Sequence, residues 1–315
     1  MPALIARTLR ALPSLLLLAA CLPASAVARR PAAPPAATPA GRHAAPITLY
    51  AAGDIARCAN PDPAWSGAAA TAALIDAGLA FDPGAAVLAL GDLTYPVGAP
   101  AEFTDCYGPT WGRFKARTYP TPGNHEYATK GAAGYFGYFG AAAGPGYYSI
   151  RLGAWRVFSL NSNLAAPAHA VQLAWLRAEL ARQPARCTLA YWHHPLYSSG
   201  MKGNDDSMKD AWRVLYEAGA DVVLSGHDHL YERFAPQDTD GRRDDRRGLR
   251  QFVVGTGGAF PTPFLRTRAN SEARDSNHSG VLKLVLRDDG FDWQFLQVAG
   301  GSGEDEPDRG SARCH

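Results

Sequence analysis

The chain has 315 residues, of which 47% are hydrophobic and 19% are charged, so it is long enough to bury a full core in one large domain or two smaller ones. Its formal net charge of +2 is spread along the sequence and forms no basic stripe. This balance argues against nucleic acid or an anionic membrane as the partner, whereas small anions remain compatible with it. We favour a single folded domain.

The N-terminal residues 1–26 have the features of an export signal. Arg7 and Arg10 precede an apolar stretch, and the triplet Ala24-Ser-Ala26 is typical of a cleavage site. Because the stretch is too short for a transmembrane helix, we expect no stable insertion in a membrane. The alternative is a lipid anchor at Cys21, since Leu18-Ala-Ala-Cys21 resembles the box before a lipidated cysteine. In both cases the protein would be exported, either to the periplasm or to the medium.

The residues that follow predict a spacer and then one catalytic domain. Residues 27–46 are rich in proline and alanine and have no periodic apolar positions, which is typical of an extended, disordered linker. We place the folded domain at residues 47–315. Its first strand is expected at 47–52, a helix at 63–80 and a second strand at 85–90, which together make a βαβ unit.

The middle and the end of the domain predict a second sheet and a polar tail. Residues 96–121 contain glycine, proline and aromatics without a period, so we expect a long functional loop. The remaining apolar segments predict a hairpin at 147–152 and 155–160, helices at 168–181 and 206–218, strands at 188–192 and 221–224, and antiparallel strands at 251–255, 281–286 and 291–298. Residues 300–313 are expected to be a solvated tail.

Four cysteines remain once Cys21 is set aside, and an even number in an exported protein favours disulfides over free thiols. Four cysteines allow three pairings. We choose Cys58 with Cys106, which would join two loops, and Cys187 with Cys314, which would tie the tail to a core strand.

The most informative feature is a series of polar side chains placed where apolar segments end. Glycines open the turns in Gly53-Asp54, Gly91-Asp92 and Gly226-His227, which is how α/β proteins place ligand-binding groups at the edge of a sheet. Such a cluster is costly unless cations neutralise it. We expect seven metal ligands: Asp54, Asp92, Tyr95, Asn124, His193, His227 and His229.

The ligand types predict two transition-metal ions. Hard oxygens combined with imidazoles suit iron, manganese or zinc better than calcium, which prefers oxygens alone. Asp92 is the natural bridge, since one carboxylate can give an oxygen to each of two cations. His227 and His229 are two residues apart, so in an extended segment their side chains point to the same side and can serve neighbouring metals.

Five ordered motifs carry a resemblance to a known family. The motifs are Gly53-Asp54, Gly91-Asp92-Leu-Thr-Tyr95, Gly123-Asn124-His125-Glu126, His193-His-Pro195 and Gly226-His227-Asp-His229-Leu-Tyr-Glu-Arg233. They resemble the calcineurin-like metallophosphoesterases, and Tyr95 with Tyr231-Glu-Arg233 resembles the purple acid phosphatase branch. The resemblance implies a four-layer α/β/β/α sandwich with two mixed β-sheets.

The resemblance also implies a role for each residue. A ferric ion would be held by Asp54, Tyr95 and His229, and a divalent iron, zinc or manganese ion by Asn124, His193 and His227, with Asp92 between them. His125 would be a catalytic acid, and His194 would face the cavity or lie nearby. One departure is Ala56, where the superfamily usually carries a histidine, so that Tyr95 would supply the missing ligand.

The function implied is hydrolysis of phosphate monoesters, by in-line attack of a hydroxide that the two metals hold, as in an acid phosphatase. The alternative is a phosphodiesterase acting on nucleotides or other diesters, because the same metal core serves both reactions. A rival of another class is a surface protein that keeps the metal site only for structure. Glu232 and Arg233 are expected to pair with each other or to brace the ligand loop.

Overall fold

The computed structural model describes residues 45–59, 66–300 and 306–315, which lie in the unit His43–His315. The predicted export signal, Cys21 and nearly all of the predicted spacer lie outside the described residues. Among the helices that can be described, none has the length and the apolar character needed to cross a membrane.

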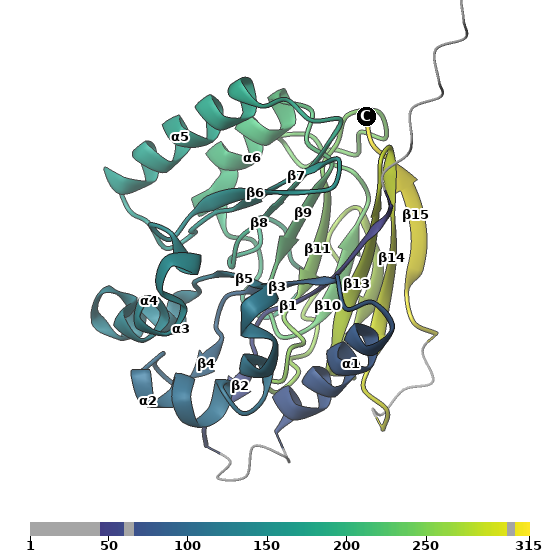
Figure 1. Ribbon diagram of the computed structural model, residues 1–315. Coiled ribbons are helices and arrows are strands. Elements are labelled where there is room, and N and C mark those ends of the chain that lie inside the picture. Colours follow the sequence, from purple (N-terminus) through teal and green to yellow (C-terminus); the bar gives the residue numbers. More distant parts are fainter. Residues whose placement is uncertain (1–44, 60–65, 301–305) are drawn as a thin grey trace, which may run out of the picture. The chain divides into compact units, whose positions relative to one another are not determined.

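The first sheet has six strands in the order β15-β14-β13-β1-β3-β5 (Figure 1). Strands β1, β3 and β5 run parallel to one another, while β13, β14 and β15 continue the sheet antiparallel. The bounds are β1 Ile47–Ala52, β3 Ala86–Leu90, β5 Thr118–Thr121, β13 Gly280–Arg287, β14 Gly290–Gln297 and β15 Arg309–Arg313. Strand β3 is buried at every position, as expected for a parallel strand covered on both faces.

The second sheet has seven strands in the order β12-β10-β11-β9-β8-β7-β6. Its parallel centre is β7, β8, β9 and β11, and β6, β10 and β12 are antiparallel additions. The bounds are β6 Tyr148–Leu152, β7 Trp155–Ser159, β8 Cys187–Tyr191, β9 Val222–Ser225, β10 Tyr231–Phe234, β11 Arg250–Val254 and β12 Ser271–Asp275. A small parallel pair, β2 Ala56–Arg57 and β4 Thr94–Tyr95, lies apart from both sheets.

The two sheets share one hydrophobic core, in which Leu49 and Leu88 of the first sheet belong to the same cluster as Leu189 and Phe252 of the second. Helix α1 (Gly67–Phe81) contacts the first sheet at β13. Helices α5 (Ala168–Arg182) and α6 (Lys209–Glu217) contact each other, and their apolar side chains form a second cluster with the second sheet. The architecture is therefore the predicted sandwich of two mixed sheets between helical layers (Figure 1).

Two expectations about irregular segments are wrong. Residues 96–121 contain short helical turns and strand β5, because buried aromatics such as Phe103 and Trp111 fix this segment against the core and its end pairs with β3. The expected solvated tail instead ends in β15, which pairs with β14 through its backbone. The short helices of the domain are α2 Pro100–Glu102, η2 Phe103–Tyr107, η3 Trp111–Arg117, α3 Asn124–Ala128, η4 Lys130–Ala132, α4 Ala133–Phe139, η5 Gly140–Ala143 and η6 Asp206–Met208.

Both predicted disulfides are present. Cys58 is bonded to Cys106, and Cys187 at the start of β8 is bonded to Cys314, directly after β15. Asp221 reinforces the second cross-link, because its carboxylate accepts hydrogen bonds from the backbone N–H groups of Thr188 and His315. The C-terminus is thus fixed between the two sheets.

Replacing both Cys187 and Cys314 by alanine should lower the free energy of unfolding. The bond spans 127 residues, and the loss of loop-closure entropy predicts a cost of about 4–5 kcal/mol. Urea unfolding followed by circular dichroism measures it. The matched control is the double alanine variant at Cys58 and Cys106, which spans 48 residues and should cost slightly less. An unchanged midpoint in the first variant would contradict the prediction.

Candidate metal centre

Five parallel strands from the two sheets bring the predicted ligands to one edge. Asp54 follows β1, Asp92 follows β3, Asn124 begins the helix after β5, His193 follows β8 and His227 follows β9. The two sheets are joined here by backbone hydrogen bonds. The N–H of Gly53 donates to the carbonyl of Val254 at 2.9 Å, which links the end of β1 to the end of β11.

A first group of ligand atoms comes from Asp54, Tyr95 and His229. The Tyr95 hydroxyl lies 2.8 Å from Asp54 Oδ1 and 3.1 Å from His229 Nε2. His229 Nε2 lies 3.3 Å from the same Asp54 oxygen. The other ring nitrogen of His229 contacts the carbonyl of Phe260 at 2.9 Å, which orients the imidazole so that Nε2 faces the group.

A second group comes from Asn124, His193 and His227. His193 Nε2 lies 3.2 Å from Asn124 Oδ1 and 3.1 Å from His227 Nδ1. The Nδ1 of His193 contacts the carbonyl of Leu90 at 2.9 Å, so this ring too is held by a backbone group on the side away from the cluster.

Asp92 connects the two groups. Its Oδ2 lies 3.3 Å from the Tyr95 hydroxyl and 3.1 Å from His193 Nε2, and its side chain is fully buried. The same atom therefore borders both sets of donors. Donors of this kind, converging around a buried carboxylate, fit a pair of transition-metal ions.

The backbone is strained where it presents these ligands. Asp54, Asp92 and His227 have φ values of 59°, 50° and 73°, a region that residues other than glycine seldom occupy and that costs about 1–3 kcal/mol at each position. Gly91 allows a close approach, because a Cβ on it would lie 2.6 Å from the His193 ring. The glycines in the sequence motifs thus make room for the ligands.

The buried titratable groups of the site shift one another's pKa. Burial by itself raises the pKa of Asp54, but the hydrogen bond and charge of His229 outweigh it and lower the pKa to about 2. Burial lowers the pKa of His193, but Asp92 outweighs that effect and raises it to about 9. The pKa of Tyr95 is well above its usual value because of burial and the two aspartates. Without cations the site therefore holds protons that metal binding would release.

Two further histidines flank the ligands. His125 donates its backbone N–H to Asp92 Oδ1 at 2.8 Å, its Nδ1 contacts the carbonyl of Pro96, and its Nε2 lies 3.8 Å from Asp92 Oδ2. His194 contacts the Ser162 hydroxyl through Nδ1 at 2.7 Å. His193 contacts Asp92 and Asn124, whereas the ring centre of His194 lies 4.4 Å from that of His227, so that His194 borders the second group of ligands.

Three buried carboxylates hold the ligand loops, and sequence analysis assigned that role to only one of them, Glu232. Glu126 accepts hydrogen bonds from the backbone N–H groups of four residues, Asp92, Leu93, Thr94 and Gly123. Asp228 accepts from the N–H groups of Lys202 and Gly203 and from the Ser198 hydroxyl. The third, Glu232, accepts from the N–H and hydroxyl of Ser199.

Lys202 was also missed. Its ammonium lies 3.3 Å from His227 Nδ1, and its side chain is otherwise exposed. Asp228 anchors the backbone at Lys202, and the ammonium lies beside the second group of ligands. Of the two expected roles for Glu232 and Arg233, bracing the loop is right for Glu232, whereas Arg233 pairs with Asp308 and Glu272 instead.

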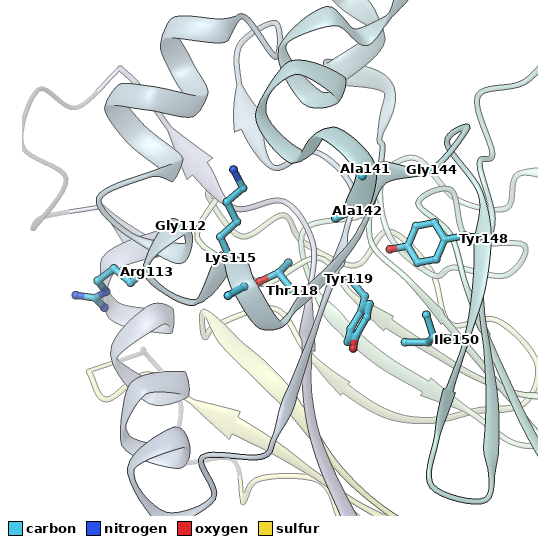
Figure 2. A pocket seen from close by; sticks show the side chains of 11 residues that line it. Gly112, Arg113, Lys115, Thr118, Tyr119, Ala141, Ala142, Gly144, Tyr148 and Ile150 are labelled. Carbon is cyan, nitrogen blue, oxygen red and sulfur yellow. The ribbon is translucent and has the colours of Figure 1, made fainter.

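A separate cavity of about 780 Å³ contains none of the predicted ligands. Figure 2 shows Tyr148 and Ile150 at one end of it and Arg113 at the other. Its two cationic residues are already engaged, since Arg113 pairs with Asp76 and the Lys115 ammonium lies over the ring of Tyr138. Both cationic residues of this cavity thus have partners, and the cavity lies apart from the ligands.

Comparison with known proteins identifies the family. The model of the calcineurin-like phosphoesterase family matches residues 47–231. The chain belongs to this family. Among curated relatives, purple acid phosphatase 21 of Arabidopsis thaliana is 31% identical over 150 residues, covering 44% of this chain and 34% of the relative. Phosphoenolpyruvate phosphatase of Allium cepa is 31% identical over 183 residues, covering 48% and 36%. The chain thus spans about a third of these relatives.

Solved structures share the fold. The purple acid phosphatase PPD1 from yellow lupin covers 83% of this chain, with 53% of its own length, a TM-score of 0.64 and 20% identity. A dimetal phosphatase from Danio rerio covers 84% of this chain and 98% of its own, with a TM-score of 0.57 and 13% identity. GAP50 of Plasmodium, described as an anchor in the inner membrane complex, covers 86% and 89%, with a TM-score of 0.62 and 13% identity.

Replacing Glu126 by glutamine should weaken metal binding. The new NH₂ group would face backbone N–H donors of the Asp92 loop, and leaving such donors unpaired costs about 2–3 kcal/mol. Calorimetric titration of the metal-free protein with Zn²⁺ measures the affinity, which should fall at least tenfold. Glu217→Gln, at an exposed position at the end of α6, is the control. Equal zinc affinity in both variants would show that the Asp92 loop needs no such brace.

Proposed function

We propose that this protein is a dinuclear-metal phosphatase that hydrolyses phosphate monoesters, similar to the purple acid phosphatases. The observation that carries the proposal is the position of Asp92 Oδ2, which lies 3.1 Å from His193 Nε2 and 3.3 Å from the Tyr95 hydroxyl. One carboxylate shared by two donor sets is what a pair of neighbouring cations requires.

We assign a ferric ion to the first group of ligands and divalent iron, zinc or manganese to the second. Ala56, buried on β2, offers no donor where the superfamily usually has a histidine. The Tyr95 hydroxyl is the donor available instead, and a phenolate is a hard, anionic ligand that favours Fe(III). When bound, the two cations would supply Lewis acidity and an activated water.

The protein's own residues would handle the two ends of the ester. The Nδ1–H of His125 donates to the Pro96 carbonyl, so the Nε2 of His125 lies on the side of Asp92. When the ring is protonated on both nitrogens, this Nε2 would give its proton to the leaving oxygen. On the side of His227, Lys202 would hold non-bridging phosphate oxygens. A dianionic monoester gains more from this charge than a monoanionic diester does, which is why we favour the monoester over the alternative of a phosphodiesterase.

We also propose that the protein is exported. Two disulfides tie the described domain together, and such cross-links persist in oxidising compartments. An export signal at residues 1–26, or a lipid anchor at Cys21, would account for them.

Replacing Tyr95 by phenylalanine should abolish the visible colour of the iron-loaded protein. The absorption band that we expect comes from charge transfer between a tyrosinate and Fe(III), so it requires the hydroxyl of Tyr95. Visible spectroscopy together with metal analysis tests this. Tyr107→Phe is the control, since Tyr107 is also buried but its hydroxyl has no hydrogen-bond partner among the described residues. A band that persists in the Tyr95 variant would contradict the ligand assignment.

The metal-loaded enzyme should turn over p-nitrophenyl phosphate faster than bis-p-nitrophenyl phosphate. Replacing Lys202 by methionine removes a charged contact to the phosphate, and this should lower kcat/KM for the monoester by about tenfold. The effect on the diester should be smaller, because its phosphate carries less charge.

Steady-state kinetics on both substrates measures the ratio, and Lys283→Met on β13 is the control for the loss of a lysine. A wild-type enzyme that prefers the diester would favour the phosphodiesterase instead. An equal loss of kcat/KM for both esters would show that Lys202 does not distinguish the two substrates by their charge.

A further inference from the structure

Phe260 is an exposed aromatic side chain on a segment that is fixed to the metal centre. The residue is 72% exposed, yet hydrogen bonds hold its backbone on both sides. The N–H of Ala259 donates to the carbonyl of Asp54 at 2.8 Å, and the N–H of Thr262 donates to the carbonyl of His229 at 2.9 Å. The carbonyl of Phe260 itself contacts His229 Nδ1 at 2.9 Å. The backbone of Phe260 therefore contacts His229, a member of the first group of ligands, directly.

Arg57 holds one face of this ring. Its guanidinium carbon lies 4.0 Å from the centre of the Phe260 ring, which is within the range of a cation–π contact. Arg57 ends β2, where it pairs with Tyr95 of β4. In the part of the chain that the structure describes, its guanidinium forms no ion pair with a carboxylate. Because most of Phe260 remains exposed despite this contact, the opposite face of the ring is open to solvent.

Several exposed apolar residues lie in segments that adjoin the ligand loops. Of the six large ones among the described residues, four lie in segments next to the ligand loops: Val97, Met201, Phe260 and Leu265. Val97 follows the residue whose carbonyl contacts His125, and Met201 precedes Lys202. A phosphate group is charged and gains nothing from apolar contacts. We therefore expect these apolar side chains to contact the other end of the ester, which is the leaving group.

We propose that Phe260, held by Arg57, is the platform on which a planar aromatic leaving group stacks. The proposal rests on the phosphatase function proposed above and adds the class of substrate. An aromatic ring on the substrate can lie against the open face of Phe260, while donors at the edge of the Arg57 guanidinium meet polar substituents on it. The ligand is an aryl phosphate or a nucleotide, which share this planar ring.

Phosphonates separate binding from chemistry, because their carbon–phosphorus bond is not hydrolysed. We would measure the dissociation constants of benzylphosphonate and methylphosphonate by calorimetry on the metal-loaded protein. Phe260→Ala should raise the dissociation constant of benzylphosphonate by about threefold to tenfold, which is the range of one aromatic pair. The dissociation constant of methylphosphonate should not change. Phe260→Trp should retain the benzyl preference. Phe81→Ala, at a residue that is 94% exposed at the end of α1, should change neither constant.

A second pair of compounds distinguishes the two sources of the ring. KM is measured for AMP and for ribose 5-phosphate, which differ only in the base. If Phe260→Ala raises KM for AMP alone and leaves benzylphosphonate unaffected, the ring that stacks is a nucleobase. If it affects benzylphosphonate and not AMP, the substrate is an aryl ester in which the ring is joined directly to the phosphate.

Three results would overturn the platform. In the first, Phe260→Ala weakens the binding of benzylphosphonate and of methylphosphonate equally, which means that the residue only shapes the metal centre. In the second, it changes neither the phosphonates nor AMP. In the third, the metal-loaded wild-type protein binds neither methylphosphonate nor inorganic phosphate, and the phosphatase function fails together with the platform. Normal binding of inorganic phosphate in the first two cases shows that the platform alone has failed.

Discussion

The shared carboxylate of Asp92 is the constraint on which the site depends. It is fully buried, and it lies within 3.3 Å of donors from both groups of ligands. A charge in such a place is unfavourable unless neighbouring groups stabilise it. One of those groups comes from the other sheet, since His193 follows β8 whereas Asp92 follows β3. The two sheets must therefore meet at the carboxyl ends of their parallel strands, and the core between them fixes that meeting.

Much of this arrangement could be predicted from the sequence, because the relevant signals are local. A buried parallel strand is a continuous apolar run, and a glycine followed by a polar residue marks its end, as at Gly91-Asp92. The five ordered motifs resembled a family with this fold, and all seven expected ligands lie in two groups that contact each other. Strand β5 before Asn124 was not expected, because Thr118–Thr121 is not an apolar run and lay within the predicted loop. The cysteine pairing chosen from the three possible ones was also right.

What escaped prediction depends on neighbours that are distant in the sequence. The role of Glu126 is set by backbone N–H groups more than thirty residues away in the sequence. The residues next to Glu126 in the sequence do not indicate these partners. Lys202 is one of several lysines until the fold brings it to His227. Strand β15 has no apolar alternation to signal it, since an edge strand can be held by its backbone and a neighbouring disulfide. Likewise the fold alone does not give the activity, because GAP50, described as an anchor, shares it.

The acidic residues of the motifs that are not ligands have a common physical purpose. Asp54, Asp92 and His227 have left-handed backbone conformations, and such strain persists only where the surroundings over-determine it. Glu126 holds the strained backbone of the Asp92 loop through its hydrogen bonds. Asp228, which lies between His227 and His229 in the sequence, anchors the loop of Lys202. Because a buried carboxylate with several N–H donors is a strong acceptor at a fixed position, it can hold a loop in a conformation that the loop would not adopt alone.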